Sequence, residues 1–198
     1  MFVTFEGLDG SGKSTQAELL RARLEADGVD VVSTREPGGT ELGERLRDLV
    51  LHGGHVGPWA EALIYVAARA QLVDEVIRPA LDRGASVICD RYLDSSVAYQ
   101  GVARGLGLDR MLELNLAAIG GIVPDRTYLL ELDPSQVASR IRRHHDRLER
   151  EGDNFRERAA AGYRELAQRF PERIVVLDAT RPVDELAEEV YGSLRVRT

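Results

Sequence analysis

The sequence lacks several features that mark secreted, membrane-spanning and nucleic-acid-binding proteins. Cys89 is the only cysteine, so no disulfide can form within the chain. No run of about 18 apolar residues occurs, and the apolar N-terminus is too short for a signal peptide and lacks its basic flank. The formal net charge of −7 argues against binding to nucleic acid through bulk electrostatics. We therefore expect a cytoplasmic globular protein with no nucleic-acid or membrane partner.

Internal repeats and low-complexity tracts are also absent from the sequence. The length of 198 residues suits one domain that spans residues 1–198. Cys89 lies in an apolar run, residues 87–89, where a thiol behaves as a small hydrophobe. We predict that Cys89 is buried in a strand.

The N-terminal stretch carries the strongest motif. Residues 2–6 (FVTFE) predict a buried strand, Gly7 to Ser14 match the P-loop pattern G-x-x-x-x-G-K-S, and a periodic apolar pattern predicts a helix after them. Glycines let successive N–H groups point inward around phosphates, Lys13 can reach the β- and γ-phosphates, and the Ser14 hydroxyl can ligate Mg²⁺. The alternative is a glycine-rich turn before an ordinary helix, but the strand–loop–helix context favours the P-loop.

Strands and helices alternate along the rest of the chain. Strands are expected at residues 2–6, 29–34, 86–89, 127–132 and 174–177. This pattern predicts an α/β fold: a five-stranded parallel sheet with helices on both faces. Asp90 follows the third strand, where a P-loop protein places the carboxylate that organises Mg²⁺. Arg35 ends the second strand, so it faces the same crevice unless it is a surface residue of a turn.

The longest helical pattern runs from residue 58 to residue 81, and Pro79 should kink or end its regular bonding. Tyr65 and Arg69 lie four residues apart and therefore on one face of this helix. Arg69 borders the apolar stripe and needs a partner, either a ligand or a glutamate on a neighbouring helix. The polar stretch 93–101 that follows the third strand suits recognition of a base and sugar, although its Ser and Asp residues also cap helices.

A polar, arginine-rich segment covers about residues 140–153. In an acidic protein this local reversal of charge indicates an anionic ligand; the alternative is a solvated helix with Arg–Glu pairs. Because the segment has few apolar anchors, we predict a short mobile lid that closes over bound ATP. The P-loop itself contains no arginine, so the lid would deliver one to the transferring phosphoryl group. Arg143 is our first choice and Arg147 our second.

Three classes of P-loop protein remain open at this point: a nucleoside-monophosphate kinase, a kinase of another small metabolite, and a nucleotide switch that is not a kinase. The Asn-Lys-x-Asp loop of guanine-binding switches does not occur. Cations for a phosphate, aromatic rings for stacking and an amide for a base edge favour a nucleotide acceptor over a sugar or a shikimate-like acid. These residues are Arg35, Arg69, Arg91, Tyr65, Tyr99 and Gln100.

Five motifs, in order over residues 1 to about 180, resemble those of bacterial thymidylate kinases. They are Phe5–Ser14, Thr34–Thr40, Ala68–Gln71, Asp90–Tyr92 with Ser95–Gly101, and Asp146–Glu149. The resemblance implies the P-loop nucleoside-monophosphate kinase fold, a homodimer, and phosphorylation of dTMP to dTDP by direct in-line transfer from ATP with Mg²⁺, for dTTP synthesis.

Carried onto this chain, the resemblance implies a role for each motif residue. Lys13, Arg91 and the lid arginines would be catalytic, and Ser14 and Asp90 would lie around Mg²⁺. The ATP phosphates would be held by Gly7, Leu8, Asp9, Gly10, Ser11, Gly12, Lys13, Ser14 and Thr15. The dTMP site would comprise Arg35 and Arg91 on the phosphate, Asp9 on the 3′-hydroxyl, Tyr65 stacked on thymine, Arg69 on its exocyclic oxygen, Ser96 and Gln100 near the base, and Tyr99 near C2′.

Two further expectations concern the backbone and the chemistry. The Glu36–Pro37 bond is predicted to be cis, since this would turn the chain sharply and aim Arg35 into the crevice. The acceptor, a phosphate monoester, has a second pKa of about 6 and is already largely dianionic at neutral pH. No general base is therefore expected in the site.

Overall fold

The computed structural model describes residues 1–140, 147 and 151–195. Its strands form one five-stranded sheet, in which every pair is parallel and the order is β2-β3-β1-β4-β5. The predicted α/β fold is confirmed, and the P-loop strand lies at its centre. The strands are β1 (Phe2–Glu6), β2 (Val31–Arg35), β3 (Ser86–Asp90), β4 (Arg126–Glu131) and β5 (Ile174–Asp178).

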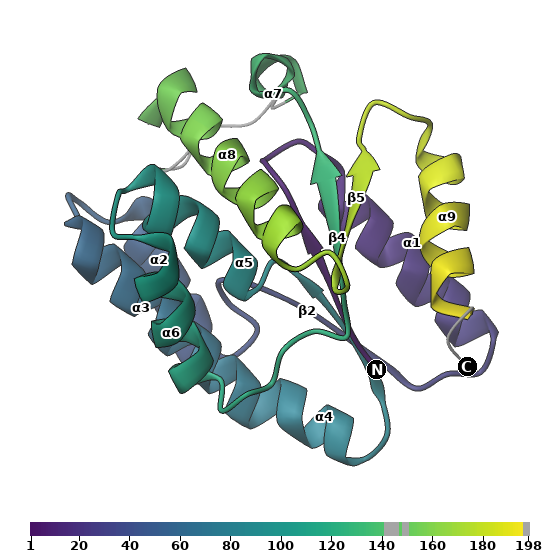
Figure 1. Cartoon of the computed structure of the whole chain (residues 1–198). Coiled ribbons are helices and arrows are strands. Elements are labelled where there is room, and N and C mark those ends of the chain that lie inside the picture. The colour runs from purple at the N-terminus through teal and green to yellow at the C-terminus, as the bar shows by residue number, and fades with distance from the viewer. Residues whose placement is uncertain (141–146, 148–150, 196–198) are drawn as a thin grey trace.

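Helices cover both faces of the sheet. Helices α1 and α9 (purple and yellow) lie together on one face, while α8 crosses the other (Figure 1). In order they are α1 (Lys13–Ala26), α2 (Glu41–His52), α3 (Pro58–Leu72), η1 (Val73–Ile77), α4 (Arg78–Asp82), α5 (Leu93–Ser96), η2 (Val97–Ala103), α6 (Leu108–Ala118), α7 (Pro134–Arg140), α8 (Asp153–Arg169) and α9 (Val183–Arg195). In the described part of the chain, no helix has the length and apolarity needed to cross a membrane.

The central strands are buried on both faces, as a parallel sheet between two helical layers requires. Val3, Phe5, Val87 and Ile88 are at most 1% exposed, and Cys89 is fully buried in β3 as predicted. The core is therefore built on β1 and β3. The loops that follow these strands are anchored to this rigid core.

Two segments, η1 and η2, are π-helical. The first interrupts the long helix predicted at 58–81, just before Pro79, which has no N–H to donate and whose ring clashes with the carbonyl four residues earlier. The sequence did not predict η2 as a helix. Its small and aromatic residues are held in place by burial against α8 and α6 rather than by helix propensity.

Candidate functional site

The P-loop connects β1 to α1 and depends on glycine at its first position. Gly7 has φ of +135°, and a Cβ there would lie 2.5 Å from the carbonyl oxygen of Leu130. Ser11 Oγ is buried and has no hydrogen-bond partner in the described part of the chain. An orphaned hydroxyl at a helix N-terminus is a donor and acceptor poised for an anion. Leu8, by contrast, turns into the core (3% exposed) and offers only its backbone to a ligand.

Lys13 begins helix α1 and is almost fully buried. Its Nζ donates to the Leu8 carbonyl oxygen over 2.8 Å. Burial and, next, the nearby Arg91 guanidinium lower the pKa of Lys13 from 10.5 to about 8. Among the residues that the structure describes, no carboxylate is bonded to this cation, and a polyanion bound there would supply the counter-charge. Thr15 lies exposed beside it in the first turn of α1.

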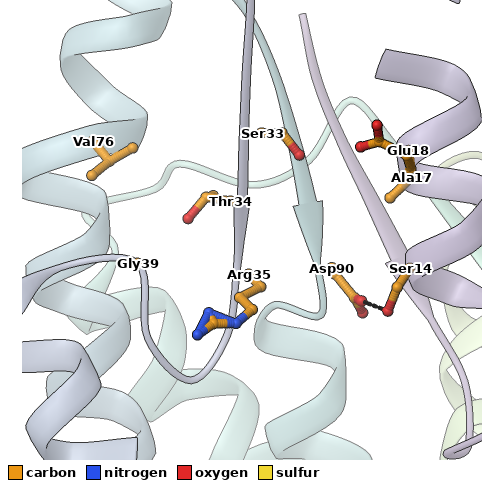
Figure 2. A pocket seen from close by; sticks show the side chains of 9 residues that line it. All are labelled: Ser14, Ala17, Glu18, Ser33, Thr34, Arg35, Gly39, Val76 and Asp90. Atoms are coloured by element: carbon orange, nitrogen blue, oxygen red, sulfur yellow. Dashed lines mark hydrogen bonds between the residues drawn. The ribbon is translucent and has the colours of Figure 1, made fainter. Parts of the chain in front are cut away.

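Ser14 and Asp90 meet at the carboxyl end of β3, beside the P-loop strand. The Ser14 hydroxyl donates to Asp90 Oδ2 in a short hydrogen bond (Figure 2). The two residues line a pocket of about 420 Å³ together with Arg35, Gly39, Val76 and residues of β2 and α1. Hydroxyl and carboxylate oxygens are ligands that Mg²⁺ accepts, usually with waters and substrate phosphates completing its shell. The donor set therefore fits Mg²⁺. Groups of three or more carboxylate, imidazole or thiol side chains suited to a metal do not occur among the described residues.

Arg35 ends β2 and faces the same pocket, as the parallel sheet predicted. Its guanidinium donates to both Glu44 carboxylate oxygens, over 3.2 and 3.1 Å, and both side chains are about half exposed. The Glu36–Pro37 bond that follows is cis, which confirms the prediction. Glu44 also accepts a hydrogen bond from the Gly39 N–H, so α2 closes this loop against β2.

Arg91 joins the end of β3 to the P-loop. It is the only residue other than glycine with positive φ (70°) in the described part of the chain. Its Nη2 donates to Asp9 Oδ1 over 2.7 Å, and its Nη1 donates to the Gly7 carbonyl oxygen over 3.0 Å. The guanidinium also lies 5.5 Å from the centre of the Tyr99 ring. Arg91 therefore contacts both Asp9 and Tyr99, and all three residues were predicted for the acceptor site.

Glu6 lies behind Arg91 at the end of β1 and is completely buried. Its Oε1 accepts hydrogen bonds from the Tyr92 and Ser95 N–H groups, over 2.7 and 3.3 Å. Its Oε2 accepts from the Ser95 and Tyr163 hydroxyls, over 2.6 and 3.0 Å. Burial and, to a smaller extent, Asp94 raise the pKa of Glu6 to about 7.

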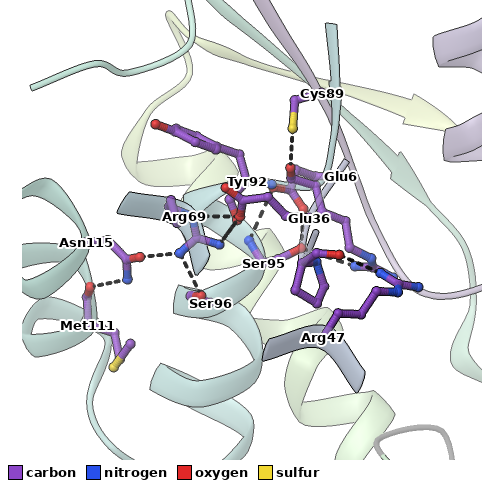
Figure 3. Close-up of polar contacts among 12 residues, drawn as sticks. Glu6, Glu36, Arg47, Arg69, Cys89, Tyr92, Ser95, Ser96, Met111 and Asn115 are labelled. Carbon is purple, nitrogen blue, oxygen red and sulfur yellow. Dashed lines mark hydrogen bonds and ion pairs between the residues drawn. The ribbon is translucent and has the colours of Figure 1, made fainter. Parts of the chain in front are cut away.

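Arg69 is buried and fully hydrogen-bonded (Figure 3). Its acidic partner is Glu36, in the loop after β2, whereas we expected a helical glutamate or a ligand. The five N–H groups donate two bonds to Glu36 and one each to the Ser96 hydroxyl, the Asn115 amide oxygen and the Tyr92 carbonyl. A contact with a base oxygen therefore requires that one of these bonds be exchanged, and the role of Arg69 toward thymine stays a prediction.

Glu61 of α3 is a buried carboxylate that binds side chains from two other segments, η2 with its C-cap residue and the chain at residue 147. Gln100 Nε2 donates to its Oε1 over 2.9 Å, and Arg104 donates to both of its oxygens. Arg147 donates to Oε2 over 2.6 Å and to the Val50 carbonyl oxygen over 2.8 Å. Gln100 and Arg147, predicted for the base and for the transferring phosphoryl group, are thus tied to this carboxylate. Arg143, our first choice for the catalytic arginine, lies outside the described residues.

The two aromatic residues predicted to contact the acceptor, Tyr65 and Tyr99, pack against different helices, α2 and α8. Tyr65 packs with Val50 and Leu51 in a small apolar cluster. Tyr99 packs edge-on against Tyr163, with ring centres 6.1 Å apart, and lies 6.0 Å from the Phe155 ring. Both tyrosines are 8% exposed, so each has a small accessible face.

Sequence reasoning missed the supporting residues of the site. Glu36, Glu61, Ser95, Asn115 and Tyr163 come from five different segments, and only the fold brings them together. One signal was available: Glu6 is the only charged residue in an otherwise apolar strand pattern, and such a residue in a central strand must have buried partners.

Comparison with known proteins agrees with this geometry. The model of the thymidylate kinase family matches residues 5–190. Thymidylate kinase of Clavibacter michiganensis subsp. michiganensis is 53% identical over 196 residues, which cover 96% of this chain and 92% of that protein. Thymidylate kinase of Deinococcus radiodurans is 48% identical over 200 residues, with 100% and 97% covered.

A solved structure shows the same likeness in three dimensions. The crystal structure of thymidylate kinase from Ehrlichia chaffeensis superposes with a TM-score of 0.83 at 33% identity, covering 98% of each chain. A family match over nearly the whole chain, full-length relatives at about half identity and a shared fold all agree. This chain therefore belongs to the thymidylate kinase family.

Proposed function

We propose how this member of the thymidylate kinase family phosphorylates dTMP to dTDP, with ATP as the donor. The observation that carries the proposal is the contact of Arg91 with the P-loop. Arg91 comes from the end of β3, yet it donates to Gly7 and Asp9 of the loop after β1. The guanidinium that would bind the dTMP phosphate thus lies against the loop that would bind ATP. The acceptor phosphate and the γ-phosphate would meet there.

The donor side is formed by the P-loop. We assign the β- and γ-phosphates to the backbone N–H groups of Gly7 to Thr15, to Lys13 and to the orphaned Ser11 hydroxyl. Ser14 and Asp90 would hold Mg²⁺, whose charge would offset that of the donor phosphates. These two side chains bond each other, so their oxygens lie close together, as ligands of one cation must.

The acceptor side is formed by the ends of β2 and β3 and by the helices that face them. Arg35 and Arg91 would bind the dTMP phosphate, and Arg35 would exchange its half-exposed bonds to Glu44 for it. Asp9 would accept from the 3′-hydroxyl and Tyr99 would lie against C2′. Tyr65 would stack on thymine, while Arg69, Ser96 and Gln100 would line the base from their fixed positions in buried networks.

The chemistry needs positioning and charge rather than proton abstraction. The acceptor phosphate is largely dianionic at neutral pH, so its oxygen attacks without a base. Lys13, Arg35 and Arg91 bring two anions together and oppose their repulsion, which accounts for the cluster of cations at one sheet edge. A lid arginine that stabilises the negative charge of the transferring phosphoryl group remains a prediction from the sequence. Arg143 is the first choice and Arg147 the second.

We also propose that the protein forms a homodimer through α3. Trp59 and Leu63 of α3 are 43% and 52% exposed, and Leu116 of α6 is 37% exposed. Helices α3 and α6 pack against each other, and each carries exposed apolar side chains. An isologous contact with a second copy would cover them. Sedimentation at micromolar concentration tests this, and a monomer would overturn it.

The experiment that tests the proposed function is a panel of acceptors with ATP and Mg²⁺, followed through ADP release. dTMP should be the best acceptor by a wide margin. Faster turnover of GMP, CMP, AMP or a non-nucleotide acid would refute the assignment of the acceptor site. Omitting Mg²⁺ should abolish turnover, and persistent activity in a chelator would refute the role given to Ser14 and Asp90.

A further inference from the structure

Glu6 lies one layer behind the candidate site, and none of the proposed contacts with substrate uses it. It is nevertheless a fully buried carboxylate with four hydrogen-bond donors directed at it. Two of these donors are backbone N–H groups and two are hydroxyls. Through the N–H groups the carboxylate acts on the backbone at Arg91, and through the hydroxyls it acts on the Arg91 guanidinium.

The first effect is on the backbone. Arg91 has positive φ, a conformation that is unfavourable for a residue with a Cβ. The next N–H group, that of Tyr92, donates to Glu6 Oε1 over 2.7 Å. Glu6 therefore binds the chain at the residue where it leaves this unfavourable turn, and it fixes the direction in which Arg91 departs from β3.

The second effect is on the guanidinium. Arg91 Nη1 donates to the Ser95 and Tyr163 hydroxyl oxygens, each over 3.1 Å. A hydroxyl has one proton, and guanidinium N–H groups only donate. Since the Ser95 and Tyr163 hydroxyls both donate to Glu6, both present lone pairs to Arg91. The carboxylate thereby sets the direction of the hydrogen bonds that hold the arginine.

We propose that Glu6 is a positioning residue for Arg91: through the Tyr92 N–H and the Ser95 and Tyr163 hydroxyls, it holds the guanidinium in place to bind the acceptor phosphate. This rests on the proposed role of Arg91. It assigns a function to the buried end of β1 and predicts that acceptor affinity, more than donor affinity, depends on a residue that touches neither substrate.

The substitution Glu6→Gln tests this with almost no change of shape. The two backbone N–H groups at Oε1 are obligate donors, so the amide oxygen takes that position and the NH₂ group faces the two hydroxyls. The amide then donates to Ser95 and Tyr163. These two hydroxyls lie 2.8 Å apart, so one can donate to the other, but the remaining proton turns toward Arg91 Nη1, itself a donor. Loss of an ordered bond to a charged group corresponds to about 10- to 100-fold in affinity.

We therefore expect Glu6→Gln to raise the Kd for dTMP by about 10- to 100-fold, with a much smaller change in the Kd for ATP, both measured by calorimetry. Glu131→Gln is the matched control, since it removes the same charge at the end of the neighbouring strand β4, where Glu131 pairs with Arg164 at the surface. An unchanged Kd for dTMP in Glu6→Gln would overturn the inference.

A thermodynamic cycle separates positioning from a general loss of stability. In the double variant Ser95→Ala/Tyr163→Phe there are no hydroxyls left to reverse, so adding Glu6→Gln should have little further effect on the Kd for dTMP. Equal effects of Glu6→Gln with and without the hydroxyls would refute the mechanism. So would an effect confined to the melting temperature.

The pH profile supplies a second readout. The pKa of Glu6 is raised to about 7 by burial, so lowering the pH through 7 protonates it and mimics the Gln variant. The affinity of the wild type should fall toward that of Glu6→Gln below pH 7, and the dTMP phosphate titrates equally in both. Parallel profiles would contradict the inference.

Other charged or titratable groups also interact electrostatically with Glu6. They are Lys13, Arg69, Cys89, Asp94, Tyr99 and Arg173.

Arg91→Ala distinguishes this inference from the proposed function. If this variant binds dTMP as tightly as the wild type, the role of Arg91 is wrong and the role of Glu6 falls with it. If it loses affinity while Glu6→Gln does not, the proposed function stands and only the positioning role is refuted.

Discussion

Lys13 should take up a proton when the nucleotide binds at alkaline pH. Burial lowers its pKa to about 8. Phosphates bound beside the amine favour the ammonium form and should return the pKa toward 10.5 or above. Below pH 7 the Lys13 amine is already charged with or without nucleotide, so binding takes up almost no proton. Above pH 8 the amine is largely neutral before binding, so binding must draw a proton from solvent.

The magnitude follows from the pKa value. A group with a pKa of about 8 is about one-tenth deprotonated at pH 7, half at pH 8 and nine-tenths at pH 9. Proton uptake per bound ATP should therefore rise from about 0.1 to about 0.9 across this range. The same shift affects stability. Because the unfolded state binds more protons than the native state between pH 8 and 10.5, the contribution of Lys13 to the free energy of unfolding increases as the pH rises through that window.

The sequence offers an unusually direct assay, because Lys13 is its only lysine. Protein labelled with ¹³C at the lysine ε-carbon gives a single lysine methylene signal, whose chemical shift reports the charge of the amine. A titration with and without ATP should give two curves, with the midpoint near pH 8 only in the empty protein. Calorimetry at pH 7, 8 and 9, in buffers of different ionisation enthalpy, counts the protons independently.

Two outcomes would refute the reasoning. A midpoint above pH 10 in the empty protein would mean that burial does not disfavour the ammonium group. Proton uptake that persists unchanged in Lys13→Arg would mean that another group is responsible, since a guanidinium stays charged throughout this range. Glu6, with a pKa of about 7, is the group to examine in that case.

Three further predictions concern the helices around the crevice and the lid. Tyr99→Ala should narrow the preference for dTMP over its ribonucleotide analogue by about 5- to 100-fold, because a buried 2′-hydroxyl without a partner costs about 1–3 kcal/mol; an unchanged ratio of kcat/KM would contradict the assignment. Gly162→Ala should lower the free energy of unfolding by roughly 1–2 kcal/mol in denaturant titrations despite its better helix propensity. The added Cβ would lie 2.9 Å from the Cα of Ala98, and a gain in stability would show that α8 moves freely on η2. Arg143→Ala should lower kcat by about 10³–10⁵-fold with nearly unchanged affinity for dTMP, whereas Arg150→Ala should not; equal small losses would leave the lid without a catalytic arginine.

The sequence predicted the fold because its signals are local. The P-loop pattern, the alternation of strands and helices and the placement of Asp90 after a buried strand each depend on a few neighbouring residues. Parallel pairing then brings the ends of β1, β2 and β3 to one edge, so Ser14, Arg35 and Asp90 could be placed together in advance.

The supporting networks could not be predicted, since they depend on side chains that are distant in the sequence. Arg69 shows this best. Its position beside an apolar stripe required a partner, but the choice of Glu36 depends on the path of the loop between β2 and α2, which brings this residue against α3. Helix η2 was missed for a related reason, because tertiary packing supports a helix that local propensity does not indicate.

The position of β1 in the sheet has a consequence for how the protein is made. The strand is the first of the five in sequence, yet it lies at the centre, pairing Phe2 with Val87 and Val3 with Arg126. During synthesis β1 leaves the ribosome long before either neighbour exists, and closing such long loops is entropically costly and slow. Even after β3 has been made, the other edge of this apolar strand stays unpaired until β4 has been made, so the phosphate-binding loop gains its full support late. Nascent chains that stop before Glu131 should therefore depend most on chaperones for their solubility.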